Sequence, residues 1–385
     1  MKLYAMSDLI LDKEFPLNKD LIHLNHAAVA PLPQRTTNAI IQFAQENTRQ
    51  GSLNYSVWME TEKELRNKLV KLINAGSVDD IALLKNTSEA LSVVAYGLDW
   101  HSGDNIVISN QEFPSNRIVW ESLANKGVEL RIANFNDKSP EDNIIKLCDK
   151  HTRLVAVSSI QYASGYRTDL HKLGEYCRNN DILFCVDAIQ SVGAVTFDVQ
   201  SIGADFVMAD GHKWMLGPEG LAFFYCHPNS RDKLKLNQFG WHMTEDYLNF
   251  DAQNWEIAAS NRRFECGSPN MLGIHALNAS LSLLLEYGMD NVEDALLHKV
   301  DFFMDYIKQS KNYELLTQAK PNHYGGIVTF KHTKSDANVL YNQLSNQGIL
   351  CATRGGGIRF SPHFYTPSEN IKRSIDILDR IEVKG

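Results

Sequence analysis

Short apolar runs alternate with longer amphipathic stretches between residues 81 and 226, and this alternation constrains the fold more than any other feature of the chain. Continuous apolar runs that are separated by helical patterns are typical of strands buried on both faces. They predict an α/β fold with a mostly parallel central sheet flanked by helices. The expected helices cover residues 88–98, 115–126 and 170–179. The expected strands are IALL (81–84), NIVIS (105–109), RLVAVSSI (153–160), ILFCVDA (182–188), DFVMAD (205–210) and LAFFYC (221–226).

The pattern changes near Pro269. A long helical stretch, MLGIHALNASLSLLLEYG, precedes a helix–strand–helix section whose strand candidates are GGIVTF (325–330) and GGGIRFSP (355–362). This section predicts a smaller α+β domain, and the absence of a low-complexity linker favours close packing of the two parts. We predict three units: an N-terminal segment (1–20) that packs with the small domain, a large domain (21–268) and a small C-terminal domain (269–385).

Composition excludes several classes of protein. The 385 residues carry a formal net charge of -8, so no basic surface for nucleic acid is expected. No apolar run has membrane-spanning length, and residues 1–15 are too acidic and interrupted for a signal peptide, so we expect a cytoplasmic protein. The six cysteines are scattered without a CxxC pair and should be reduced, mostly buried thiols. The thirteen histidines form no HExxH pattern, so no metal is expected.

Two charged residues stand near the ends of neighbouring apolar runs. Asp187 closes one run, and Lys213 follows the next in the sequence Asp210-Gly211-His212-Lys213. Ligands of open α/β sheets bind at the carboxyl ends of the strands, so these side chains should share one edge. A lysine becomes nucleophilic when burial or nearby cations lower its pKa. A buried carboxylate needs a cationic partner, for example a protonated pyridine nitrogen. Each also has a plainer explanation, Lys213 as a surface lysine and Asp187 as a turn or helix cap.

A phosphate site is predicted where one strand passes into a helix through Asn86-Thr87-Ser88. Free N–H groups and hydroxyls at a helix N-terminus bind phosphate. Asn86 with Glu89 also fits a capping box, which is an equally good explanation of the pattern. The chain has no P-loop lysine and no GxGxxG, so a monophosphate is favoured over ATP or a dinucleotide.

Three further side chains could bind two ligands, one with a planar ring and one with a carboxylate. Phe113 follows a strand end, where it either packs in the core or stacks on a planar ring. Arg354 and Arg359 flank three glycines and could form a fork for a carboxylate, although single arginines in strands commonly make surface ion pairs. With the amine, the ring-nitrogen acid and the phosphate site, these features meet the requirements of pyridoxal phosphate.

The chain resembles the class V aminotransferase family of pyridoxal-phosphate enzymes of fold type I, in the branch that contains cysteine desulfurases, selenocysteine lyases and isopenicillin N epimerase-like proteins. The resemblance extends from LNHAAVAPLP (24–33) to GGIRFSPHFYTPSENI (356–371), and the stretch 187–220 is its most specific part. It implies that Lys213 binds the cofactor covalently and moves the substrate's α-proton. It also implies that Asp187 pairs with the pyridine nitrogen and that Gln190 contacts the phenolate oxygen.

The resemblance implies roles for further residues as well. Phosphate contacts would come from Thr87, Ser88, Asp210 and His212, with His212 also counted among the catalytic residues. Ser268, in RRFECGSPN, would reach the phosphate in the partner subunit of a homodimer. The substrate would be an amino acid whose carboxylate binds Arg359, with Arg354 nearby. The pocket for it would be lined by Asn25, His26 and Ala27.

The sequence departs from the desulfurase pattern at three places. Phe113 stands where desulfurases stack a histidine on the ring. Tyr162 stands where desulfurases have an asparagine, so the contact to the ring oxygen comes from Gln161 or Tyr162, or is lost. Desulfurases carry a catalytic cysteine on the loop between the two arginines, whereas only Gly355-Gly356-Gly357-Ile358 lies between Arg354 and Arg359 here. Cys351 precedes that loop in a candidate strand and is expected to be packed, which disfavours persulfide formation.

These observations predict an enzyme of amino acid metabolism that acts at the α-carbon of its substrate. Loss of the α-proton to Lys213 is common to three outcomes, namely transamination, epimerisation and β-elimination of a C–S bond. Aminotransferase-like or epimerase-like chemistry is our first expectation, followed by C–S lysis and then by cysteine desulfuration. A catalytically inactive pyridoxal-phosphate-binding regulator is the non-enzymatic alternative. A nicotinamide dehydrogenase is disfavoured by the glycine spacing.

Overall fold

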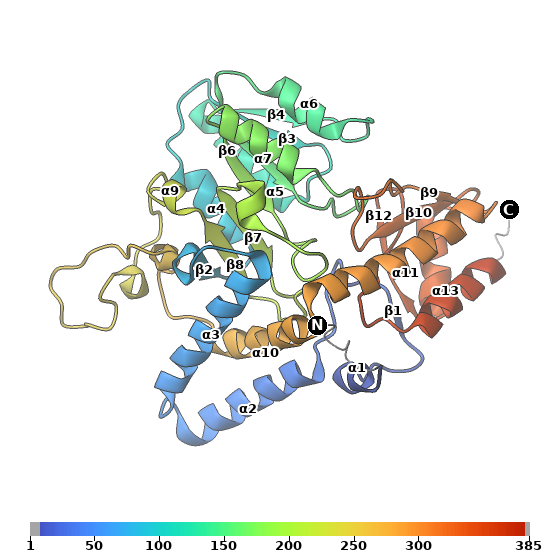
Figure 1. The fold of residues 1–385 in the computed structure, drawn as a ribbon, viewed down its shortest axis with the longest axis horizontal. Helices are drawn as coiled ribbons and strands as arrows, with labels where there is room; N and C mark the ends of the chain where they lie inside the picture. The colour runs from blue at the N-terminus through green and yellow to red at the C-terminus, as the bar shows by residue number, and fades with distance from the viewer. Residues whose placement is uncertain (1–7, 382–385) are drawn as a thin grey trace.

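The computed structural model describes residues 8–381 and is built around a seven-stranded sheet (Figure 1). Its strand order is β2-β8-β7-β6-β5-β3-β4. Strand β8 runs antiparallel to both of its neighbours, and the remaining pairs are parallel. The predicted mostly parallel sheet is therefore confirmed. The strands are β2 (Ile81–Leu84), β3 (Asn105–Ser109), β4 (Glu129–Ala133), β5 (Thr152–Ser158), β6 (Leu183–Asp187), β7 (Phe206–Asp210) and β8 (Ala222–Cys226).

Both faces of this sheet are buried, which explains its continuous apolar runs. In β6, Phe184 and Val186 belong to the apolar core on one face, and Leu183 and Cys185 belong to the core on the other. Successive side chains of a strand point to opposite faces, so a strand covered on both sides must be apolar throughout. The helices of this part are α2 (Gln34–Gln50), α3 (Tyr55–Ile73), α4 (Thr87–Gly97), α5 (Ser115–Glu121), α6 (Pro140–Leu147), α7 (Leu170–Asn179), α8 (Val199–Ile202), α9 (Pro228–Arg231) and α10 (Met271–Tyr287). Single 3₁₀ turns are η1 (Val78–Asp80), η2 (Ser122–Lys126), η3 (Trp241–Met243) and η4 (Asn261–Phe264).

The C-terminal part forms a second, smaller sheet with its own apolar core, on the right in Figure 1. Its antiparallel order is β12-β13-β10-β9. A separate parallel pair joins β1 (Ile22–His23) to β11 (Ile349–Leu350), so residues just after the predicted N-terminal segment (1–20) contact the C-terminal part. The remaining elements are α1 (Asp8–Glu14), α11 (Met289–Gln309), β9 (Tyr313–Leu315), β10 (Val328–His332), α12 (Ala337–Asn346), β12 (Ala352–Arg354), β13 (Gly357–Phe360) and α13 (Ser368–Arg380).

Helix contacts bear on the predicted domain limits. Helix α10 packs against α2 and α3, whereas α11 contacts β9, β10 and α13. These contacts favour a boundary near Gly288 rather than after residue 268, although the three-unit division stays a prediction. Residues 1–7 of the predicted N-terminal unit lie outside the described residues. No helix within residues 8–381 has the length and apolar character needed to cross a membrane.

Candidate active site

A small pocket of about 260 Å³ lies at the carboxyl ends of the central strands. Asp187 ends β6 and Asp210 ends β7, and Lys213 sits in the turn that follows β7. The parallel strands therefore bring to one edge side chains that are far apart in sequence. The lining consists of Ala27, Ala28, Val29, Thr87, Ser88, Phe113, Ser115, Tyr162, Asp187, Ile189, Gln190, Asp210, His212, Lys213, Glu219, Arg354 and Arg359.

Lys213 and Asp187 place a buried amine and a buried carboxylate in this pocket. Burial lowers the pKa of the Lys213 amine, while the charge of Asp187 opposes that change. Burial also raises the pKa of Asp187, against the hydrogen bond that its carboxylate accepts from the backbone N–H of Ile189 at 3.1 Å. The ring centroid of Phe113 lies 5.7 Å from Nζ of Lys213. The pocket thus presents an amine whose neutral form is favoured by desolvation.

The N-terminus of α4 offers one buried hydroxyl, that of Thr87, without a partner among the described residues. Asn86 accepts a hydrogen bond from the N–H of Glu89 at 2.8 Å, so the capping explanation of this motif holds. The cap does not use Thr87, whose backbone N–H donates to Asp210 Oδ1 at 2.9 Å and whose buried hydroxyl has no partner among the described residues. Ser88 donates to the hydroxyl of Ser115 at 2.8 Å. Capping and anion binding are therefore compatible here.

His212 stands next to this group as a neutral ring. Its Nδ1 lies 3.7 Å from Oδ2 of Asp210. Burial lowers the pKa of His212 to about 4, and Lys213 contributes in the same direction. Burial raises the pKa of Asp210 to about 6. The imidazole is therefore neutral near pH 7, and it forms no strong ion pair with Asp210.

Arg359 brings a cation into the other side of the pocket. It is 2% exposed, and Nη1 donates to the carbonyl oxygen of Tyr162 at 2.8 Å. Its Nη2 donates to Asn25 Oδ1 at 3.3 Å, and its Nε is buried without a partner in the described part of the chain. Arg354 is exposed and donates to the carbonyl of Thr353. One arginine is thus built into the site and the second lies at its mouth.

The family model for class-V aminotransferases matches residues 22–373. The chain belongs to this family. A probable cysteine desulfurase of Methanothermobacter thermautotrophicus is 28% identical, with 97% of this chain and 98% of that protein covered. An uncharacterized aminotransferase of Bacillus subtilis, YcbU, is also 28% identical, with 94% and 95% covered. The resemblance stated from sequence is confirmed at the level of the family.

Several solved structures share the fold of this chain. The apo cysteine desulfurase of Thermococcus onnurineus NA1 superposes with a TM-score of 0.87 at 23% identity, with 98% of both chains covered. The cystine C–S lyase C-DES, in complex with cysteine persulfide, superposes with a TM-score of 0.89 at 22% identity and 95% and 99% coverage. A C-DES variant with glycine covalently linked to its pyridoxal-phosphate cofactor also gives a TM-score of 0.89, at 21% identity and 96% and 99% coverage. At these identities the likeness shows the fold alone.

The structure places four predicted site residues outside the pocket lining. Asn25 is one of them, and it meets the site through the hydrogen bond that it accepts from Arg359. Gln161 is buried and donates to Ser109 Oγ at 3.2 Å and Glu112 Oε1 at 3.0 Å, while Tyr162 lines the pocket instead. His26 is fully buried and binds the carbonyl of Ser361 and the hydroxyl of Tyr365, whereas its neighbour Ala27 lines the pocket. Ser268 lines a different pocket, together with Lys85, Asn86 and Glu89.

Sequence reasoning missed Glu112, a buried carboxylate just beneath the site. It accepts hydrogen bonds from Ser109 Oγ at 2.6 Å, from Asn116 at 2.8 Å and from Gln161 at 3.0 Å. The backbone N–H of Ser158 donates to it as well, at 3.0 Å. Glu112 therefore joins the ends of β3 and β5, one residue before Phe113. Its position next to Phe113 in the chain was the available signal, but its partners are up to 49 residues away.

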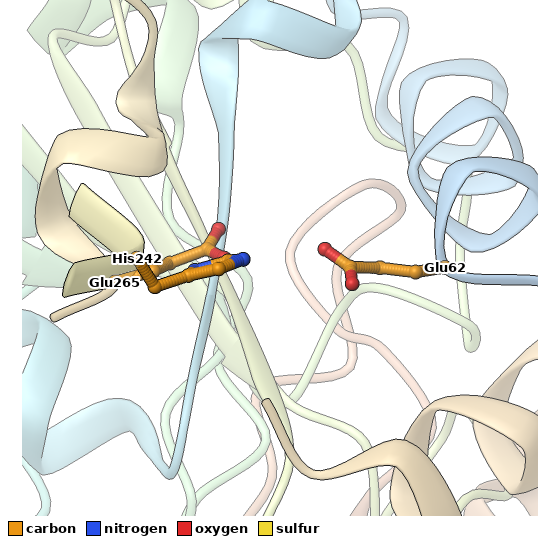
Figure 2. Close-up of side chains that lie close together, drawn as sticks. All are labelled: Glu62, His242 and Glu265. Carbon is orange, nitrogen blue, oxygen red and sulfur yellow. The ribbon is translucent and has the colours of Figure 1, made fainter. Parts of the chain in front are cut away.

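A cluster of Glu62, His242 and Glu265 is the place where described side chains come nearest to a metal-binding arrangement (Figure 2). The guanidinium of Arg66 already binds both carboxylates, at 2.6 Å from Glu62 and 2.8 Å from Glu265. A buried cation therefore stands where a metal ion would have to bind. The cluster links α3 to the segment that precedes α10 and does not border the pocket.

Pyridoxal phosphate fits the residues of the pocket. The unpartnered Thr87 hydroxyl at the start of α4 and the neighbouring Ser88 suit a phosphate. Asp187 suits a protonated ring nitrogen, and Lys213 suits an aldehyde. Phe113 has an exposed ring to offer for stacking, since 40% of the residue is accessible. Arg359, with its unpartnered Nε, remains free for a carboxylate.

Proposed function

We propose that the chain is a pyridoxal-phosphate-dependent enzyme that removes the α-proton of an amino acid and cleaves a C–S bond by β-elimination. One observation carries the proposal: the amine of Lys213, the carboxylate of Asp187 and the guanidinium of Arg359 share one small buried pocket. When bound, the cofactor supplies an aldehyde that condenses with amines and a pyridinium ring that accepts electrons from the α-carbon. Residues of the chain itself bind the substrate and transfer its proton.

Each of the three residues has one task. Asp187, held by the N–H of Ile189, keeps a proton on the ring nitrogen. Arg359 binds the substrate carboxylate, and its contact with Tyr162 sets the direction of the guanidinium. Lys213 accepts the α-proton as a neutral amine, the form that burial favours.

Two features disfavour the desulfurase route, in which a protein cysteine takes the sulfur. The connection between Arg354 and Gly357 is a tight turn with Gly355 and Gly356 at positive φ, and no cysteine stands in it. Cys351 is 3% exposed, and burial raises its pKa to about 12, so it holds no thiolate. Elimination needs no protein thiol. Relatives named as desulfurases and the fold shared with a cystine lyase support a sulfur-containing substrate.

Transamination or epimerisation, the first expectation from sequence, becomes the second candidate. Both begin with the same proton abstraction by Lys213. They differ from each other in the atom to which the proton returns. The similarity to the protein named uncharacterized aminotransferase YcbU supports this alternative. The three outcomes leave different products, so one assay separates them.

The decisive experiment incubates the purified holoenzyme with cystine, cysteine conjugates, other amino acids and keto acids. Pyruvate with released thiol or persulfide indicates elimination, keto-acid exchange indicates transamination, and loss of chirality indicates epimerisation. Alanine with a protein-bound persulfide would contradict the proposal. Borohydride trapping with peptide mapping should label Lys213. Lys68→Ala is the control for this labelling and should not change it. Lys68 is also partly buried, with a pKa lowered by burial, but it lies outside the pocket.

We further propose a homodimer in which Ser268 reaches the partner's phosphate. The yellow segment between α9 and α10 extends away from the body of the protein (Figure 1). Arg262 anchors it by donating to the carbonyls of His242, Thr244 and Glu245. Apolar side chains on this segment are exposed, which supports an interface. They are Phe239, Leu248, Phe250, Trp255 and Ile257.

Sedimentation of the wild type and of interface variants tests the dimer. Sedimentation should give twice the chain mass, and Phe250→Asp with Trp255→Asp should give monomers. A monomeric wild-type protein would contradict the proposal.

A cytoplasmic location is also proposed, supported by six cysteines that are all free thiols.

A further inference from the structure

Trp214 follows Lys213 and fixes the orientation of a neighbouring amide. It is 0% exposed, and its indole Nε1 donates to Oε1 of Gln190 at 2.8 Å. Nε2 of Gln190 donates to the carbonyl oxygen of Ala27 at 3.1 Å. An indole N–H can only donate and a backbone carbonyl can only accept. These two partners therefore decide which way round the amide stands, although an isolated amide is free to flip.

The fixed amide leaves one donor unused. The amide nitrogen of Gln190 carries two hydrogens, of which Ala27 takes one. Gln190 is 2% exposed and lines the active-site pocket. Its oxygen is occupied by Trp214, so a ligand meets an N–H and not a carbonyl.

Trp214 is itself held from the C-terminal part of the chain. His363 accepts the backbone N–H of Phe364 on Nδ1 at 2.8 Å, which leaves Nε2 as the protonated nitrogen. That Nε2 donates to the carbonyl oxygen of Trp214 at 3.1 Å. Burial lowers the pKa of His363 to about 3, so the ring stays neutral and the tautomer is fixed.

Two glycines make room for this residue. A Cβ at Gly193, which has φ +94°, would lie 2.3 Å from the Trp214 carbonyl oxygen. A Cβ at Gly326 would lie 2.4 Å from Cη2 of the indole ring. Real Cβ atoms do not approach other atoms so closely, so both positions need glycine while Trp214 stands as it does.

We propose that Trp214 is a positioning residue for the cofactor, which acts by holding the Gln190 amide with its N–H toward the anionic ring oxygen. This inference rests on the proposed use of pyridoxal phosphate. A donor facing that oxygen stabilises its charged form, whereas a flipped amide would present a carbonyl and repel it. The contacts with Ala27 and His363 make the arrangement depend on the start of the large domain and on the C-terminal part together.

The test is the pH titration of the bound cofactor's visible absorbance. Trp214→Phe keeps an aromatic side chain and removes the indole N–H. The midpoint of the titration should rise by about one pH unit, because the deprotonated form of the cofactor loses a hydrogen bond. The matched control is Trp58→Phe, because Trp58 is buried and donates to Glu46 Oε1 at 2.9 Å, far from the pocket. An unchanged midpoint in Trp214→Phe overturns the proposal.

Two further variants separate positioning from simple damage. Gln190→Leu should raise the midpoint by itself, and adding Trp214→Phe should then change nothing more. A further shift in that background means that Trp214 does not act through Gln190, which overturns the proposal. If Trp214→Phe does not fold, Gln190→Glu, which has no N–H, should raise the midpoint; an unchanged value contradicts the assigned orientation.

The proposed function fails in a different way. If the wild-type protein shows no visible absorbance band that borohydride fixes on Lys213, the proposed use of pyridoxal phosphate is wrong. If the band is normal but its pH midpoint is unchanged in the Trp214 and Gln190 variants, only the positioning role is wrong.

Discussion

Asn25 Oδ1 accepts a hydrogen bond from Nη2 of Arg359 at 3.3 Å, across 334 positions of the chain. The same guanidinium donates to the Tyr162 carbonyl, and burial lowers its pKa to about 10, so the cation is held in place at a cost in solvation. In the proposed function, a substrate carboxylate offsets that cost when it binds. We therefore expect Arg359→Lys to raise KM by roughly 10- to 100-fold, because a lysine keeps the charge but loses the two-pronged donor.

Steady-state kinetics with the best substrate of the panel measure this change. Cofactor absorbance should stay normal, since Arg359 is assigned to the substrate. Arg354→Lys is the matched control and should have a smaller effect, because Arg354 is exposed. Loss of cofactor in Arg359→Lys would contradict the assignment.

Asp210 should make the cofactor-free protein less stable as the pH rises. Burial raises its folded-state pKa to about 6, above the ordinary value of 3.8. Between these values the folded protein binds the proton more tightly than the unfolded chain, so the free energy of unfolding falls as the pH increases. The loss should begin near pH 4 and be complete above about pH 6, and it should amount to roughly 2 to 3 kcal/mol.

Urea unfolding of the cofactor-free protein across this pH range checks the prediction. Asp210→Asn keeps an acceptor for the Thr87 N–H but cannot ionise. The variant should gain stability relative to wild type as the pH rises through the window. A difference that does not vary with pH would show that Asp210 does not titrate there.

The strands of the central sheet were predictable because both of their faces are buried. Strand β4 was missed because most of its residues are exposed or only partly buried, with Ile132 51% exposed. The other edge strand, β2, was recognisable because all four of its residues are buried. The switch at Pro269 marked a change of pattern, but α10 still packs on α2 and α3, because helix periodicity says nothing about the partner.

The pocket residues at strand ends were predictable from the topology of parallel sheets. Asp187, Asp210 and Lys213 stand where strand ends must meet, and the structure brings them into one pocket. The hydrogen bond from Gln190 to Ala27 spans 163 positions, and no local pattern encodes it. Glu112 was invisible for the same reason. Sequence shows which residues reach the site, whereas orientation depends on contacts that only the folded chain creates.

Cys351 should behave as an inert thiol. It is 3% exposed, and burial raises its pKa to about 12. Cys351→Ala should therefore keep at least half of the C–S cleaving activity, and thiol reagents at mildly alkaline pH should label the native protein elsewhere. Mass spectrometry of labelled peptides gives the answer, with the half-buried Cys266 as the internal comparison. A persulfide on Cys351 during turnover would restore the desulfurase route.

Arg66 should be essential for folding although it lies outside the pocket. Its side chain is 12% exposed and neutralises Glu62 and Glu265, and the second of these also accepts the N–H of Leu83 at 2.8 Å. Arg66→Met leaves two carboxylates without a cation, so we expect a loss of about 3 to 5 kcal/mol in the free energy of unfolding. The exposed pair of Arg117 and Glu121 is the control, where Arg117→Met should cost less than about 1 kcal/mol. Equal losses in the two variants would contradict the prediction.

Gly326 should tolerate a side chain only when the indole of Trp214 is smaller. An alanine Cβ there would lie 2.4 Å from Cη2 and 2.7 Å from Cζ3 of the ring, so Gly326→Ala should cost about 1 to 3 kcal/mol in the free energy of unfolding. Gly76→Ala is the control, because its Cβ would lie an ordinary 3.4 Å from Asp80. Phenylalanine lacks both clashing atoms, so Gly326→Ala should cost clearly less in a Trp214→Phe background than in wild type. Denaturant unfolding of the four proteins measures this coupling, and strictly additive losses would mean that the strain at Gly326 arises from a neighbour other than Trp214.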